Sequence, residues 1–291
     1  YVGVGMRVLV FDVSRPSSPQ LVGHSPILAS GVQAIYVRSG LVYVAAGPAG
    51  LQVIDVSTPR SPRLIGSLAV AGSIFDVTVD GNLAFVVQYQ SEVQGLSGSS
   101  STWSLVLVDV EVPAHPQVLG SLPLAAGAKK VVASGGMVFV ADNFWFGQRE
   151  AFNGLTVVDA SDPSAPRLAG SLKMDEISDL EVVEHAAYAV GGLKMTTIDL
   201  VSPTSPRILS SLDLPGLANG ISVQDGLAYI ADGSPGMLVI DTSGPKSPRI
   251  IGRAKVDGAA SEVVVAGSLA FVVDDVRGMS VFDVLAPSEP S

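Results

Sequence analysis

Seven copies of one short motif run along the chain. In each copy an aspartate is followed four residues later by a proline and, after three more residues, by a second proline, as in Asp55, Pro59 and Pro62. The seven copies account for 14 of the 19 prolines. Such a repeat determines the architecture, because each copy marks one supersecondary unit. The seven aspartates are Asp12, Asp55, Asp109, Asp159, Asp199, Asp241 and Asp283.

Four short strands are predicted in each repeat of about 42 residues. We name them A to D. Strand B holds an aromatic residue in an apolar run, as in 41–45, and a tight turn such as Asp225-Gly226 usually separates it from strand A. Strand C runs into the motif aspartate, as in 51–55, and strand D follows the prolines, as in 63–68. The aromatic residues are Tyr1, Tyr43, Phe85, Phe139, Tyr188, Tyr229 and Phe271.

This pattern predicts an all-β protein, a seven-bladed β-propeller of four-stranded antiparallel blades. The repeat has no linker, so we expect residues 1–291 to form a single domain that is trimmed at both ends within a repeat. Seven B and seven C strands can be counted, but only six A and six D strands. One D–A strand pair is therefore absent, and it either lies outside this stretch of sequence or comes from another chain.

The motif itself is predicted to be structural. An aspartate at the end of a strand can accept hydrogen bonds from the next backbone N–H groups and close an Asx turn. The prolines fix φ, and we expect them to hold the connection between strands C and D extended. Seven equivalent carboxylates cannot all be active-site acids.

The segments 51–66 (LQVIDVSTPRSPRLIG) and 155–170 (LTVVDASDPSAPRLAG) resemble the LVIVD repeat. That family consists of bacterial and archaeal propeller-type proteins, many of them secreted or attached to the cell surface. The resemblance covers essentially the whole chain and implies an extracellular or cell-surface location. It implies no single activity and contributes no catalytic residues.

Charge and composition exclude several classes of function. The formal net charge is −10, and no basic cluster exceeds Lys129-Lys130, so nucleic-acid binding is not expected. The absence of cysteine excludes disulfides and thiol catalysis. Gly and Pro interrupt the uncharged stretches, and none of them is typical of a membrane span.

Two B–C connections are longer than the rest. The aromatic residue precedes its aspartate by 11 or 12 residues in five copies, but by 24 in the third copy and 20 in the fourth. The two insertions, 88–104 and 143–154, are predicted to be loops that lie side by side on one face, where repeat proteins often bind ligands. Their side chains suit a protein partner or stacking on sugar rings, unless the loops bury their own aromatics. The binding candidates are Tyr89, Trp103, Phe144, Trp145, Phe146 and Arg149.

A second candidate site is the mouth of the central channel. Asp76, Lys130, Asp179 and Glu262 occur at equivalent positions near the start of strand A. Aspartates also recur at the end of strand B, and their oxygens are of the kind that Ca²⁺ prefers, although no loop has the DxDxDG spacing. We expect no other cofactor. The metal candidates are Asp142, Asp232 and Asp274.

Three functions remain open on these residues. The first is a non-enzymatic scaffold that binds a protein partner or assembles with itself. The second is a glycan-binding module that uses the aromatic residues of the two insertions. The third is a hydrolase or lyase at the channel mouth, for which the sequence offers only carboxylates and none of the common catalytic motifs. The scaffold is the interpretation that the sequence favours.

Overall fold

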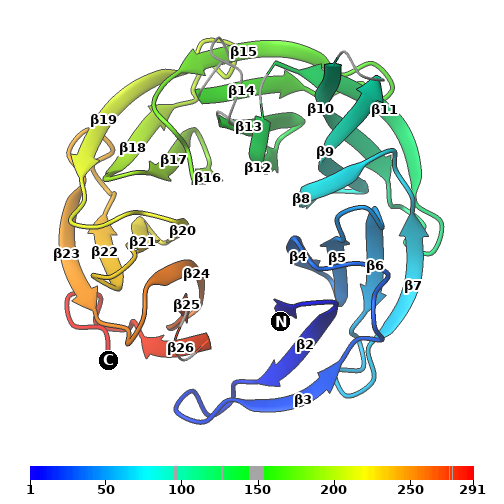
Figure 1. Ribbon diagram of the computed structural model, residues 1–291. Coiled ribbons are helices and arrows are strands. Elements are labelled where there is room, and N and C mark those ends of the chain that lie inside the picture. The colour runs from blue at the N-terminus through cyan, green and yellow to red at the C-terminus, as the bar shows by residue number, and fades with distance from the viewer. Residues whose placement is uncertain (95–97, 126, 144–153, 275, 277) are drawn as a thin grey trace. The chain divides into compact units, whose positions relative to one another are not determined.

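The fold is a β-propeller with seven blades, as predicted (Figure 1). It is seen in a computed structural model that describes residues 1–94, 98–125, 127–143, 154–274, 276 and 278–291. The described residues form 26 strands and no helix, and therefore no helix that could cross a membrane. Five of the seven antiparallel sheets have four strands and two have three.

The strands repeat in the order A, B, C, D. The A strands are β4 (Ala34–Arg38), β8 (Ser73–Asp80), β12 (Gly127–Ser134), β16 (Asp179–Val183), β20 (Gly220–Gln224) and β24 (Ala260–Ala266). The B strands are β1 (Val2–Val4), β5 (Leu41–Ala45), β9 (Leu83–Gln94), β13 (Met137–Asn143), β17 (Ala186–Gly191), β21 (Leu227–Ala231) and β25 (Leu269–Asp274).

Each C strand ends at a motif aspartate. The C strands are β2 (Arg7–Asp12), β6 (Leu51–Asp55), β10 (Gly98–Asp109), β14 (Gly154–Asp159), β18 (Lys194–Asp199), β22 (Met237–Asp241) and β26 (Gly278–Asp283). The D strands are β3 (Gln20–His24), β7 (Arg63–Leu68), β11 (Gln117–Leu124), β15 (Arg167–Lys173), β19 (Arg207–Asp213) and β23 (Arg249–Ala254). We number the blades 1 (β1–β3), 2 (β4–β7), 3 (β8–β11), 4 (β12–β15), 5 (β16–β19), 6 (β20–β23) and 7 (β24–β26).

The two three-stranded sheets confirm the predicted absence of one D–A pair. Among the described residues, blade 1 has strands B, C and D without an A strand, and blade 7 has strands A, B and C without a D strand. Blades 2–6 have the predicted four strands each. The region 174–185, where acidic residues could suggest a helix, contains strand A of blade 5.

The chain divides into two compact units. Unit 1 comprises Tyr1–Phe152 and Thr156–Ala169, and unit 2 comprises Asn153–Leu155 and Gly170–Ser291. In each unit the A strands of consecutive blades contact one another, with β4, β8 and β12 in unit 1 and β16, β20 and β24 in unit 2.

The core consists of layers between neighbouring blades. In unit 1, Tyr43 and Leu51 of blade 2 pack with Ile74 and Val106 of blade 3. In unit 2, Tyr229 of blade 6 packs with side chains of blade 7 in the same way. Strands buried on both faces need apolar residues at successive positions, and this explains the near-continuous apolar runs of strands B and C.

Tight turns join strands A and B. In blade 6 the turn residues Asp225 and Gly226 have φ of 53° and 76°. Two consecutive residues with positive φ give a turn whose twist matches that of the flanking strands, and Gly accepts this conformation without a steric penalty. The Asp-Gly signal in the sequence therefore predicted this hairpin correctly.

Candidate functional site

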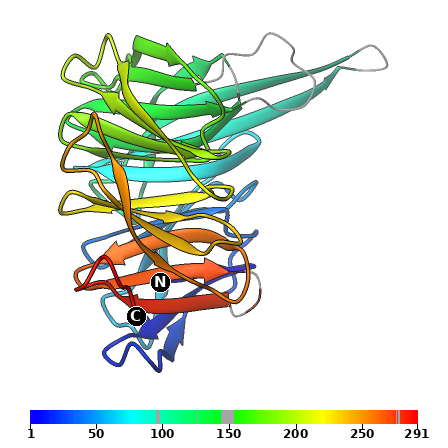
Figure 2. The same ribbon diagram turned by 90° about the vertical axis from the view of Figure 1, so that its left-hand side faces the viewer.

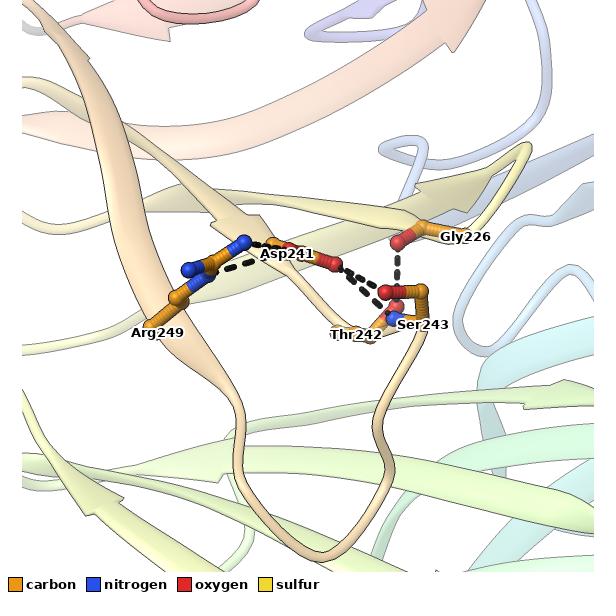
Figure 3. Close-up of polar contacts among 5 residues, drawn as sticks. All are labelled: Gly226, Asp241, Thr242, Ser243 and Arg249. Atoms are coloured by element: carbon orange, nitrogen blue, oxygen red, sulfur yellow. Dashed lines mark hydrogen bonds and ion pairs between the residues drawn. The ribbon is translucent and has the colours of Figure 1, made fainter.

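All seven motif aspartates close the turn that was predicted for them. In each, Oδ1 accepts a hydrogen bond from the backbone N–H two residues later, at 2.8–3.0 Å. Figure 3 shows this turn at Asp241, where the Ser243 N–H and hydroxyl both donate to Oδ1. The motif thus ends strand C by satisfying backbone donors.

The other oxygen of four motif aspartates binds an arginine that the sequence interpretation missed. Arg249 donates to Oδ2 of Asp241 at 2.9 and 3.1 Å, from the first residue of strand D (Figure 3). The same ion pair forms between Asp55 and Arg63, between Asp159 and Arg167, and between Asp199 and Arg207. The signal was present in the sequence, because each arginine follows its aspartate by eight residues.

The connection between strands C and D is not extended, and that expectation was wrong. In blade 2 the Ser61 N–H donates to the Thr58 carbonyl at 2.9 Å, which closes a β-turn with Pro59 at its second position. Equivalent hydrogen bonds occur in all seven corners. Proline is favoured at this position because its fixed φ matches the turn.

These hydrogen bonds keep three of the corner aspartates ionised. The serine hydroxyls at Ser57, Ser161 and Ser243, together with the backbone N–H and the arginine, lower the pKa of Asp55, Asp159 and Asp241 to about 2. A carboxylate with such a low pKa is a poor proton donor or acceptor near neutral pH. The most regular residues of the chain therefore serve its structure.

Two of the four predicted channel-mouth residues link neighbouring blades. Asp76 is buried, and its Oδ2 accepts the Val131 N–H of the next blade at 2.7 Å. Asp179 is also buried and accepts the Ile221 N–H at 2.9 Å in the same way. An A strand has one edge without a neighbouring strand, so its N–H groups need acceptors, and these carboxylates supply them.

The other two channel-mouth residues differ in exposure. Lys130 is half-buried and lies in the same unit as Asp76, whereas Glu262 is exposed and lies in the same unit as Asp179. Both make contacts of their own.

The aspartates at the end of strand B are buried. In blade 4 the Thr156 hydroxyl donates to Oδ2 of Asp142, and in blade 7 the Ser280 hydroxyl donates to Oδ2 of Asp274 at 3.2 Å. Both hydroxyls come from strand C, three residues before the motif aspartate. No group of three or more His, Cys, Asp or Glu side chains within the described parts of the chain is placed to hold a metal ion.

Blade 6 lacks this hydroxyl. Leu238 occupies the equivalent position, and neither oxygen of the fully buried Asp232 makes a hydrogen bond within the described residues. Burial raises the pKa of Asp232 to about 6 against the weaker effects of Arg253 and of the nearby Gly216 amide, which does not reach hydrogen-bond geometry. Burial likewise raises the pKa of Asp142 to about 7.

The first insertion is a β-hairpin rather than a loop. Strands β9 and β10 pair from Leu83 and Asp109 out to Gln94 and Gly98 (Figure 2). The neighbouring strands stop earlier, because β8 reaches only Tyr89 and β11 reaches only Trp103. Beyond that pair five residues of each strand pair only with each other, and this two-stranded arm is about 17 Å long at 3.4 Å per residue.

An aromatic cluster lies at the base of this arm. Tyr89 and Trp103 are directly opposite each other on β9 and β10, with ring centroids 4.9 Å apart. Phe75 of β8 packs on both, at 6.3 Å from Tyr89 and 5.4 Å from Trp103. All three side chains are half-buried. Interplanar angles of 44–76° mean that no two of the rings are coplanar. Sequence reasoning had missed Phe75, which lies at a bulge in β8.

The second insertion falls almost wholly outside the described residues. Its ends, Asn143 and Gly154, are the last residue of β13 and the first of β14. The candidates Phe144, Trp145, Phe146 and Arg149 all lie outside the described residues.

A cavity in blade 5 was not anticipated. It has a volume of about 280 Å³ and is lined by residues that include Glu176, Gly191, Lys194, Thr196 and Ser211. This is just below the usual range for small-molecule sites, about 300–1,000 Å³. Thr196 is no specific sequence signal for it, because this hydroxyl residue has equivalents in Thr156 and Ser280 of blades 4 and 7.

The chain belongs to the LVIVD-repeat family. The LVIVD repeat profile matches residues 1–25, 31–70, 126–173, 215–256 and 257–291, which is well over half of the sequence. Among curated proteins none matches this sequence.

Several solved structures share the fold at low sequence identity. A functionally unknown protein from Desulfotomaculum acetoxidans DSM 771 is 13% identical, with a TM-score of 0.76 over 98% of this chain and 91% of that one. A hypothetical selenium-binding protein from Sulfolobus tokodaii is 11% identical, with a TM-score of 0.74 over 100% and 86%. The computationally designed protein Ika8 is 11% identical, with a TM-score of 0.68 over 93% and 76%. These similarities concern the fold alone.

Proposed function

We propose that this chain is a non-enzymatic interaction propeller outside the cell or on its surface, and that the β9–β10 arm binds a protein partner. The observation that carries the proposal is the arm itself, with the half-buried cluster of Phe75, Tyr89 and Trp103 at its base. Aromatic residues of this kind dominate the energetics of protein interfaces.

The backbone of the arm supports the same conclusion. Beyond Tyr89 and Trp103, no other strand among the described residues pairs with the outer edges of the two-stranded arm. Unpaired strand edges are ready to pair with an extended segment of another chain, and an isolated two-stranded ribbon is only marginally stable. A partner that pairs with an edge and packs on the aromatic base would satisfy both the backbone groups and the apolar surface.

The location outside the cell rests on the family resemblance, since many LVIVD-repeat proteins are secreted or bound to the surface. Self-assembly through the same arm is one form of protein binding. Sedimentation of the purified chain over a range of concentrations would detect it.

Deletion of the arm is the direct test. A variant in which residues 90–102 are replaced by an Asn-Gly turn keeps Tyr89 and Trp103 but removes the arm. We expect wild type to retain a specific envelope protein of the producing organism and the shortened variant to lose it. Leu168→Ala removes an exposed apolar side chain elsewhere and serves as the matched control. Equal retention by wild type and the shortened variant would exclude the arm as the binding element.

Two further measurements address the alternatives. The tilt between the rings provides no flat platform of the kind that sugar rings stack on, so we expect no arm-dependent signal on a glycan array. A hydrolase and lyase screen with polysaccharide and ester substrates addresses catalysis. Activity abolished by Asp179→Asn, with the fold intact, would favour an enzyme over our proposal.

A further inference from the structure

We propose that the cavity in blade 5 is a binding site for a free α-amino acid with an aliphatic side chain. Every residue that lines this cavity belongs to unit 2. The site is separate from the β9–β10 arm, which belongs to unit 1, and the inference does not depend on the function of that arm.

The cavity lies on one face of the blade 5 sheet. Ala189, Thr196 and Ser211 are directly opposite one another on β17, β18 and β19, so their side chains point to the same face. Tyr188, which precedes Ala189, points to the other face and packs with side chains of blade 6. The connection 174–176, which leads to β16, also lines the cavity.

Two small residues create this space. The residue after the strand-B aromatic is Val or Ile in the other six blades, as in Ile230, but it is Ala189 in blade 5. Two positions further on, where blades 4, 6 and 7 have a buried aspartate, blade 5 has Gly191. A Cβ at Gly191 would lie 2.0 Å from the carbonyl oxygen of Glu176, so only the glycine allows this close approach of the backbone that lines the cavity.

Thr196 differs from its equivalents in its hydrogen-bond partner. Thr156 and Ser280, at the same position in blades 4 and 7, donate their hydroxyls to the buried aspartates that follow strand B. In blade 5 Gly191 offers no carboxylate, and the hydroxyl of the buried Thr196 lies 3.5 Å from that of Ser211, at the limit of a hydrogen bond. Blades 4 and 7 thus show that a carboxylate suits a hydroxyl at this position.

The charged groups at the cavity favour a zwitterion. Lys194 Nζ lies 3.7 Å from Oδ2 of Asp175, which is a long ion pair between two exposed side chains. A ligand carboxylate between Lys194 and Thr196 would gain an ammonium and a hydroxyl donor, and a ligand ammonium would take over Asp175. Because Glu176 adds a second carboxylate to the lining, a ligand that is neutral overall suits the cavity better than an anion does.

Size and apolar surface define the ligand further. An apolar cavity of about 150 Å³ holds benzene, so this cavity of about 280 Å³ has room for about ten non-hydrogen atoms. Met174, Ala189 and Ile208 supply apolar surface for an aliphatic side chain. Leucine has the size, the two charges and the side chain that these features require.

Calorimetric titration of the whole chain with L-leucine tests the site. We expect saturable binding, with chemical-shift changes of the Gly191 and Thr196 amides in a parallel NMR titration. L-Leucinamide lacks the carboxylate and N-acetyl-L-leucine lacks the ammonium, so each should bind at least about tenfold more weakly than leucine.

Three variants locate the ligand. Thr196→Val keeps the shape of the side chain without the hydroxyl and should weaken leucine binding at least about tenfold. Lys194→Gln removes an exposed charge and should weaken binding roughly threefold to tenfold, whereas Lys255→Gln, at an exposed lysine elsewhere in unit 2, is the matched control. Ala189→Ile introduces the residue of blade 6 and should abolish binding by filling the cavity, and its thermal midpoint checks that the fold is retained.

Three results would overturn the inference. One is the absence of leucine binding to the unmodified chain at millimolar concentrations. Another is binding of leucinamide as tightly as leucine, because the carboxylate is then not recognised. The third is binding that survives both Thr196→Val and a folded Ala189→Ile variant, which would place the ligand elsewhere. None of these results depends on the β9–β10 arm, so they leave the proposed function untouched.

Discussion

The aspartates that follow strand B and end strand C of one blade lie in opposite electrostatic environments. At the C–D corner, Asp241 is surrounded by the Ser243 hydroxyl, a backbone N–H and Arg249, and its pKa falls to about 2. At the B–C end of the same blade, Asp232 is buried without a hydrogen-bond donor, and its pKa rises to about 6. The difference shows that the environment, and not the residue type, determines which carboxylates can exchange protons near neutral pH.

The two ends also differ in how much they vary between blades. All seven corners have the same turn, whereas the B–C ends carry the arm, the second insertion and the buried aspartates. Structural roles are therefore concentrated at one end and blade-specific features at the other, where loops can change without disturbing the packing.

The largest expected effect concerns Asp142. Its pKa is 3.8 in the unfolded chain and about 7 in the fold, so the protonated form is favoured by folding. The stabilisation is complete below pH 4 and is lost as the pH rises through 7. At 1.36 kcal/mol per pKa unit, the free energy of unfolding should fall by roughly 3–4 kcal/mol over that range.

Chemical denaturation between pH 4 and pH 8 measures this loss. Asp142→Asn should remove most of it, because the amide does not titrate. Asp213→Asn, at an exposed carboxylate, serves as the control. If wild type and Asp142→Asn give parallel stability curves, burial of Asp142 does not raise its pKa, and the contrast between the two ends of the blade fails.

The next effect tests how tightly the corners are packed. A Cβ on Gly66 of β7 would lie 2.1 Å from the Pro113 carbonyl of the next corner. Gly66→Ala should therefore destabilise the fold by about 1–3 kcal/mol, as in other overpacked sites. Gly31→Ala is the control, since its Cβ would meet nothing closer than 3.7 Å. Thermal unfolding of the two variants compares them, and equal midpoints would mean that the corner can move aside.

Ser210 shows how one blade accommodates a side chain at the position of Gly66. Its hydroxyl donates to the Pro245 carbonyl at 2.8 Å, so a contact that excludes other side chains becomes a hydrogen bond. The position of Gly66 and Ser210 in strand D therefore requires either a glycine or a side chain that can donate a hydrogen bond to the corner of the next blade.

The Asx turns of the corners were predicted from the sequence because they are local, although the β-turn that follows each of them was wrongly expected to be extended. An aspartate, the N–H two residues later and a proline within the same turn are all visible in one short segment. The arginine at Arg63 was missed because it reaches Asp55 across the corner, where the register of strand D decides the contact. Blade number and strand order followed from the spacing of these corners together with the aromatic residues and turn signals between them.

The candidate sites were harder to predict because they depend on neighbouring strands. The sequence alone suggests that Asp76 is an acid at the channel mouth. Its role as acceptor for the Val131 N–H becomes visible only when the position of the next blade is known. The insertion at 88–104 is rich in Ser and Gly and has the composition of a loop, yet strand pairing continues through much of it from the flanking segments. Tyr89 and Trp103 were identified from the composition of the insertion. Their contact with Phe75 could not be predicted, because Phe75 lies at the bulge in β8, which the sequence does not reveal.

A smaller effect is expected at Asp232, where the missing hydroxyl can be supplied. Thr156 and Ser280 donate to the equivalent aspartates of blades 4 and 7, so Leu238→Thr places a hydroxyl on the face of the sheet that Asp232 occupies. We expect the pKa of Asp232 to fall from about 6, because a hydrogen bond favours the ionised form.

Carboxyl NMR titration measures this pKa directly. Leu238→Val has a similar shape without the hydroxyl and should leave the pKa high. If both variants lower it equally, the change comes from altered packing rather than from a donor.

The smallest effect concerns the stability that Asp241 gives the corner of blade 6 at low pH. The pKa of Asp241 is lowered to about 2, so the stabilisation that it provides is present above pH 4 and is lost as the pH falls through 2. The Ser243 hydroxyl is the main cause and Arg249, which is largely exposed, comes second. Ser243→Ala should therefore raise the pKa of Asp241 more than Arg249→Ala does, because exposed ion pairs are screened by solvent.

NMR titration of the Asp241 carboxyl in the two variants shows which substitution raises the pKa more. If Arg249→Ala has the larger effect, the ion pair rather than the Asx turn keeps the corners ionised, and high salt should then raise this pKa.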